Sequence, residues 1–121
     1  MIKMVALMKR RADLTLDEFI ERYENGHAPF ADKHLPTARH YQRRYIQPLG
    51  NPIDGSNYEP DFDVVTEIWF DDQSALEEAL GRISEPEVAA LFAADEEELF
   101  DRVAHRLFTV AHESRTDRPS A

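Results

Sequence analysis

Hydrophobic and polar residues alternate at the start of the chain. Between positions 2 and 9, every second residue on one side of an extended backbone is apolar: Ile2, Met4, Ala6 and Met8. Because the side chains of a strand point alternately to its two faces, this segment predicts a first strand. It is too short, and too regularly interrupted by Lys3 and Lys9, for a signal peptide or a membrane span.

A helical period follows this strand. Thr15 and Glu18 have the spacing of a capping box, and Leu14 can pack on Phe19, so a helix is predicted to begin at residue 16. Its apolar side chains recur at helical spacing along one stripe: Leu16, Phe19, Ile20 and Tyr23.

The end of this helix is the most informative stretch of the chain. Asn25 and Gly26 tolerate a left-handed helix ending, and Pro29 can begin a new helical turn but cannot continue the old one. His27 is therefore expected at a break between two helical segments, where an imidazole can act as an acid or a base near neutral pH.

Strand and helix patterns alternate in the rest of the chain. The predicted elements are a strand over residues 38–47, a loop over 48–60, a strand over 63–70, a helix capped by Asp72, a helical run from Ser84 to Phe100 and a last strand over 103–112. The loop is longer than most connections in compact domains, so we expect it to serve as a lid. Period two places Glu67 and Trp69 on one face of their strand.

The order β-α-β-β-α-β predicts an α+β fold of the ferredoxin-like type, an antiparallel sheet with helices on one face. The other face must be polar or meet a partner. Apolar residues on both sides of the last strand, such as Leu107 and Phe108, favour a covered face and hence a homodimer with packed sheets. We expect one domain over residues 1–113 and a flexible tail over residues 114–121.

Composition narrows the possible classes of protein. The 121 residues, 42% of them apolar, suit one domain, and the absence of cysteine excludes disulfides, thiolate metal sites and cysteine nucleophiles. A net charge of -10 opposes binding to nucleic acid. We expect a cytoplasmic protein that does not bind membranes. Without a His-Glu-x-x-His motif or a glycine-rich phosphate loop, the sequence predicts neither a metal nor a nucleotide cofactor.

Two clusters of charge stand out. Arg39, Arg43 and Arg44 flank Tyr41, and ion pairing or snorkelling on a strand is favoured over an anion site. The acidic run from Asp95 to Glu98 is interpreted as a solvated helix face.

Three segments carry recognisable motifs. The first combines a helix, an aromatic residue and a histidine-x-proline-apolar signature in Lys9-Arg10, Leu16-Asp17-Glu18-Phe19, Tyr23 and His27-Ala28-Pro29-Phe30. The second is the strand Thr66-Glu67-Ile68-Trp69-Phe70-Asp71-Asp72, and the third is Ala94-Asp95-Glu96-Glu97-Glu98-Leu99-Phe100. In this order, and spanning residues 2–112, they resemble the EthD family of the dimeric α+β barrel superfamily.

The resemblance implies a dimer of ferredoxin-like subunits with a ligand cavity between sheet and helices. It implies no single reaction, because the relatives include polyketide-tailoring dehydratases and decarboxylases, muconolactone-type isomerases and cofactor-free oxygenases. Family members often have glutamine, asparagine and histidine after a tyrosine in the second strand, whereas in this chain Tyr41 is followed by Gln42-Arg43-Arg44. Roles tied to that asparagine or histidine do not transfer.

The candidate site combines residues from four segments. His27 is the candidate general acid or base, with hydrogen bonding of the helix end as the alternative. Glu67 is the candidate second acid or base, with an ion pair to Arg43 or Lys9 as the alternative. The candidate substrate-binding residues, for which core packing or a surface position is the alternative, are Tyr23, Tyr41, Trp69, His40 and His112.

The leading hypothesis is a cofactor-independent lyase or isomerase that acts on a small aromatic or polyketide-like carbonyl compound by proton transfer. One alternative is a non-catalytic protein that binds such a compound in a degradation pathway. The other is a cofactor-free oxygenase, which oxygen consumption would distinguish.

Overall fold

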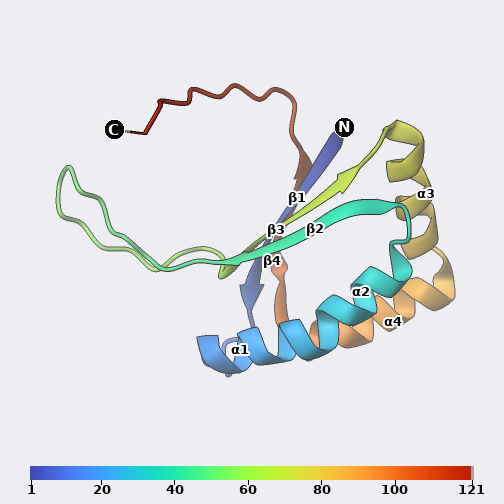
Figure 1. The fold of residues 1–121 in the computed structure, drawn as a ribbon. Coiled ribbons are helices and arrows are strands. Elements are labelled where there is room, and N and C mark those ends of the chain that lie inside the picture. The colour runs from blue at the N-terminus through green and yellow to red at the C-terminus, as the bar shows by residue number, and fades with distance from the viewer. Residues whose placement is uncertain (121) are drawn as a thin grey trace.

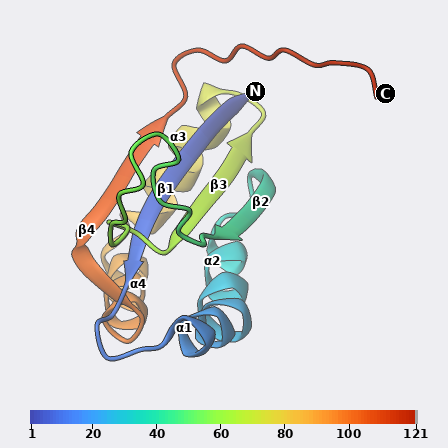
Figure 2. The same ribbon diagram turned by 90° about the vertical axis from the view of Figure 1, so that its left-hand side faces the viewer.

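The computed structural model describes residues 1–120 and contains one four-stranded antiparallel sheet with helices along one face (Figures 1 and 2). The strand order is β2-β3-β1-β4. The elements in chain order are β1 (Ile2–Arg10), α1 (Leu16–Arg22), η1 (Tyr23–His27), α2 (Ala28–His34), β2 (Ala38–Tyr45), β3 (Val64–Phe70), α3 (Gln73–Ile83), α4 (Pro86–Glu97) and β4 (Phe100–Thr109). The predicted ferredoxin-like fold is confirmed.

The two faces of the sheet have different roles. On the side covered by helices, Met8, Val64 and Phe100 pack with Phe19 in one apolar cluster, and Ile68, Phe70 and helix α3 form a second. The side chains that alternate with these along each strand point to the opposite face, among them Val5 and its cross-strand partners Glu67 and Phe108. No helix of the described chain covers this second face, which we call the open face (Figure 1).

Helix α1 begins where the sequence predicts. The Thr15 hydroxyl accepts a hydrogen bond from the Glu18 backbone, and the Glu18 carboxylate accepts one from the Thr15 backbone, each at 3.1 Å. Leu14 and Phe19 are buried in the same cluster, as expected for a hydrophobic staple.

The predicted break after this helix is wrong. The chain instead runs helically from Leu16 to His34 through a π-helical turn, η1, in which the Ala28 N–H reaches the Tyr23 carbonyl. Proline lacks an N–H and its ring collides with the carbonyl four residues earlier, and a widened turn before Pro29 removes that collision without ending the helix. Gly26 accordingly has no positive φ.

The last third of the chain differs from prediction in its boundaries, since α4 ends at Glu97 instead of Phe100 and the last strand begins and ends three residues earlier than predicted. Asp72 caps α3 as expected, accepting from the Ala75 backbone at 2.8 Å. Strand β4, however, starts at Phe100 instead of residue 103 and ends at Thr109. Its pairing with β1 is irregular between Leu7 and Lys9, because Asp101 and Arg106 of β4 lie opposite these two residues and bracket a bulge.

The loop between β2 and β3 is not a lid in this structure. It forms an arm that projects beyond the end of the sheet and away from the helices (Figure 1). Its tip is turned by Gly50 and Gly55, both with positive φ, and Leu49 and Ile53 are almost fully exposed. The predicted tail over residues 114–121 is extended and exposed as far as Ser120, and its last residue lies outside the described part of the chain.

Within residues 1–120, no helix has the length and apolar character needed to cross a bilayer.

The π-helical turn predicts the effect of a substitution at Gly26. A Cβ atom there would meet nothing within 4 Å, and the φ angle is not positive, so Gly26→Ala restricts only the unfolded chain. We expect the free energy of unfolding in urea to rise by about 0.5–1 kcal/mol. Gly55→Ala is the matched control, since its φ of +75° strains an alanine and lowers stability. If Gly26→Ala lowered stability, Gly26 would instead have a positive φ, as in a helix that ends at this residue.

Candidate functional site

A cavity of about 270 Å³ lies between the helices and the covered face of the sheet. Its walls are mainly apolar side chains from the sheet and from α2, α3 and α4, including Met4, Ala6, Ile68, Ala31, Leu35, Ala79, Ile83, Ala89 and Phe92. The polar side chains that line it are Tyr23, His27, Tyr41, Thr66, Glu96 and Arg102. Such a cavity fits a small apolar molecule with one or two polar groups.

His27 lies in this cavity with 6% of its surface exposed. The π-helical turn buries it together with Tyr23, whose ring centre is 4.8 Å away. The imidazole also makes an edge contact with Phe100, at 5.2 Å between ring centres. Its Nδ1 atom is hydrogen-bonded to the Asp95 carboxylate of α4. The Nε2 atom makes no hydrogen bond to the described residues, and the side chain lines the cavity.

Asp95 corrects the interpretation of the acidic run as a solvated face. Only 29% of its side chain is exposed, and its carboxylate fixes one nitrogen of His27. A carboxylate in this position holds the imidazole in one tautomer and stabilises the charge that proton uptake creates. The third motif of the sequence contained Asp95, but no apolar stripe along α4 marks which of its carboxylates points inward.

Three hydroxyl groups form a chain on the cavity wall. The Tyr23 hydroxyl lies 2.8 Å from Thr66 Oγ1 and 3.4 Å from the Tyr41 hydroxyl. Burial raises the pKa of both tyrosines, so they remain neutral hydrogen-bond donors. Because three hydroxyl protons serve two contacts, one proton remains for a ligand. Tyr23 and Tyr41 thus line the same cavity as His27.

Glu67, Trp69 and His40 lie on the open face, away from His27. Tyr41 pairs with Ile68 across the β2–β3 ladder, so Trp69 points to the other side of the sheet. The Trp69 ring contacts His40, at 4.3 Å between ring centres, and Lys3 Nζ, at 4.1 Å. Glu67 forms an ion pair with Arg44 at 3.2 Å, and not with Arg43 or Lys9. The predicted pairing of His27 with Glu67, and of Tyr41 with Trp69, is therefore not present.

His112 follows the end of β4 and is exposed, so it does not line the cavity.

The three arginines of β2 form ion pairs, which is the interpretation that the sequence favoured. Arg39 contacts Asp71 at 3.3 Å, Arg43 contacts Glu24 at 2.7 Å and Arg44 contacts Glu67.

The β4 bulge supplies two residues that sequence reasoning missed. Arg102 lines the cavity and pairs with Glu96 of α4 at 3.1 Å. His105 packs on the Phe100 ring at 4.9 Å, and its Nε2 is buried without a partner among the described residues. Nothing in the alternation of β4 marks a bulge, so neither position was identifiable in advance.

Residues 1–120 hold no cluster of three or more histidine, aspartate or glutamate side chains arranged to bind a metal ion.

The sequence profile of the EthD domain matches residues 11–103, which are most of the chain and include His27 and Asp95. This chain belongs to the EthD family. An EthD-family protein from Bacillus halodurans is 26% identical, with a TM-score of 0.62 over 93% of this chain and 99% of that one. Comparison with curated proteins gave no significant match.

More distant solved structures share the EthD fold. A dimeric ferredoxin-like protein from Thermobifida fusca is 15% identical, with a TM-score of 0.53 over 92% of this chain and 90% of that one. SnoaB, a cofactor-independent oxygenase from Streptomyces nogalater, is 14% identical, with a TM-score of 0.55 over 98% and 97% of the two chains.

The burial of His105 predicts a pH dependence of stability. Burial lowers the pKa of His105 in the folded protein, so the unfolded chain binds the proton more readily. The free energy of unfolding therefore falls as the pH drops from neutral through the ordinary histidine range near 6.5. His105→Gln should flatten this decline in urea titrations between about pH 7 and 5. The exposed His112→Gln is the control, and an unchanged slope in His105→Gln would contradict the prediction.

Proposed function

We propose that this EthD-family protein is a cofactor-independent lyase or isomerase that moves a proton on a small carbonyl compound. The observation that carries the proposal is the pairing of His27 with Asp95 at the wall of an apolar cavity, with the second imidazole nitrogen left for a ligand. A carboxylate-oriented histidine is a common general base, and an apolar surrounding strengthens its electrostatic interactions.

The roles follow from the chemistry of enolisation. His27 Nε2 takes a proton from the carbon next to the carbonyl group, and the electrons of that C–H bond form the enolate. The Asp95 carboxylate stabilises the resulting imidazolium. The neutral Tyr41 hydroxyl, which is in contact with the Tyr23 hydroxyl, donates a hydrogen bond to the carbonyl oxygen, where negative charge develops. Return of the proton to another carbon gives isomerisation, and loss of a leaving group gives elimination.

The cavity volume supports the smaller members of the predicted substrate class. At about 270 Å³ it lies near the lower end of typical ligand cavities. One aromatic or alicyclic ring with a carbonyl substituent fits this volume better than a fused polyketide does. The walls carry few charges, so a neutral compound is favoured.

The open face supports a homodimer as part of the same proposal. It exposes 47% of Phe108, a large apolar side chain. A second copy packed sheet to sheet would cover the exposed Phe108 ring.

Proton transfer is tested by NMR in deuterated buffer. An ortho-hydroxyaryl methyl ketone and a small lactone should take up deuterium next to the carbonyl group with the wild type. His27→Ala should slow uptake by about 10²- to 10⁴-fold, the usual contribution of a general base. Asp95→Asn should slow it by a smaller factor, because the base remains but loses its orientation.

His112→Ala is the matched control and should exchange at the wild-type rate. Line broadening of the compounds without exchange would contradict the enzymatic proposal and favour a binding protein. Oxygen uptake with the same compounds would favour an oxygenase.

Dimer formation is tested by sedimentation. At micromolar concentration the wild type should sediment as a species of about twice the chain mass of 14.0 kDa. Phe108→Glu puts a charge on the open face and should shift the protein toward the monomer, whereas Leu91→Glu on the outside of α4 should not. A wild type that sediments at 14.0 kDa would refute the packed sheets.

A further inference from the structure

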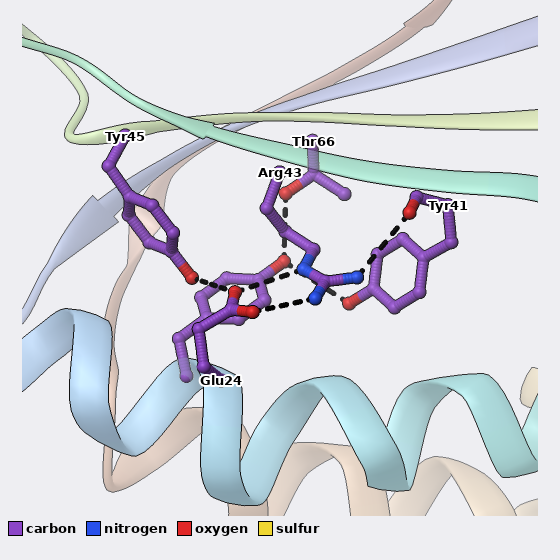
Figure 3. Close-up of polar contacts among 6 residues, drawn as sticks. Glu24, Tyr41, Arg43, Tyr45 and Thr66 are labelled. Atoms are coloured by element: carbon purple, nitrogen blue, oxygen red, sulfur yellow. Dashed lines mark hydrogen bonds and ion pairs between the residues drawn. The ribbon is translucent and has the colours of Figure 1, made fainter.

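An ion-pair cluster fastens the edge strand β2 to the π-helical turn beside the cavity (Figure 3). Arg43 donates from Nε and Nη2 to the two carboxylate oxygens of Glu24, at 3.0 and 2.7 Å. The Tyr45 hydroxyl donates to the same carboxylate. This bidentate arrangement fixes both the distance and the orientation of the two groups.

The cluster joins the two segments that carry the phenol hydroxyls of the site. Glu24 follows Tyr23 in η1, and Arg43 shares the covered side of β2 with Tyr41. The separation of 3.4 Å between the two tyrosine hydroxyls therefore depends on how β2 sits against this turn. Because β2 is an edge strand, no other strand within residues 1–120 pairs with its outer side to hold it there.

Arg43 also contacts Tyr41 directly. Its guanidinium carbon lies 4.6 Å from the centre of the Tyr41 ring, and Nη1 is 3.4 Å from the Tyr41 carbonyl oxygen (Figure 3). A cation over the ring is attracted to it and restricts its rotation. Burial raises the pKa of Tyr41, and the positive charge of Arg43 opposes that rise. The charge therefore makes the Tyr41 hydroxyl a stronger hydrogen-bond donor.

We infer that Arg43, held by Glu24, is a positioning residue that keeps the Tyr41 hydroxyl directed at the carbonyl oxygen of the bound compound. The inference rests on the proposed function. Arg43 itself lines no part of the cavity, so its effect on the reaction passes through Tyr41. Arg44, the next residue, offers a matched comparison, because it points to the open face and pairs with Glu67.

A double-mutant cycle between Arg43 and Tyr41 tests this role. Arg43→Met keeps most of the side-chain stem, and Tyr41→Phe removes only the hydroxyl. Each should lower kcat for deuterium uptake by roughly tenfold to a hundredfold with little change in KM, because the hydroxyl acts where charge develops. The double variant should be no slower than Tyr41→Phe alone. Arg44→Met should match the wild type within about twofold.

A purely structural role of Arg43 gives a different result. The effects of Arg43→Met and Tyr41→Phe would then multiply, or Arg43→Met would raise KM as much as it lowers kcat, and either outcome would overturn the inference. If thermal unfolding shows that Arg43→Met does not fold, Glu24→Gln replaces it in the cycle. That variant leaves Arg43 in place but weakens its anchor, and its effect should disappear in the Tyr41→Phe background.

Failure of the proposed function is recognised separately. If the wild type shows no exchange, the cycle is measured on the affinity for cyclohexane-1,3-dione, whose enol resembles an enolate, by NMR titration. Non-additive losses of affinity at Arg43 and Tyr41 would support the positioning role without catalysis. Additive losses of affinity would overturn that role. If the wild type does exchange and His27→Ala does not, an additive cycle between Arg43 and Tyr41 would overturn only this inference and leave the proposed function in place.

Discussion

Pro29 is the constraint on which the geometry of the site depends. Within a regular α-helix its ring would collide with the carbonyl of Asn25, and the chain avoids this by widening the preceding turn. The wide turn keeps α1 and α2 in one continuous helical rod, so that Tyr23 and His27 are both buried against the sheet. A break would have let the two segments diverge and would have separated the imidazole from the tyrosine.

The sheet separates two groups of polar residues. On its covered face, His27, Asp95 and the tyrosine hydroxyls surround an apolar cavity that suits proton transfer. On its open face, Glu67, Arg44 and the stacked rings of Trp69 and His40 form a mixed surface with a buried, unpaired indole nitrogen. The proposed chemistry and the proposed dimer contact therefore lie on opposite sides of the same strands, and residues next to each other in sequence face different surroundings.

Much of the fold follows from local patterns. Capping at Thr15 and Asp72 and the alternation in β1 place these elements, and the two-residue period correctly separates Tyr41 from His40. The pairing of strands is harder to predict from the sequence. Only the observed register shows that Tyr41 lies opposite Ile68 and hence on the other face from Trp69. Asp95 was missed as a partner of His27 for a related reason. Helix α4 is apolar on several sides, so its sequence does not indicate which carboxylate faces inward.

Helix α4 contributes a carboxylate to the site although none of its twelve side chains is buried. Its attachment rests on partly exposed contacts, which are the kind that open locally before a domain unfolds. When α4 lifts from the sheet, Asp95 leaves His27 while the two apolar clusters beneath remain folded. We therefore expect heat or denaturant to end the proposed action of His27 under conditions in which the sheet is still intact, so that inactivation precedes denaturation.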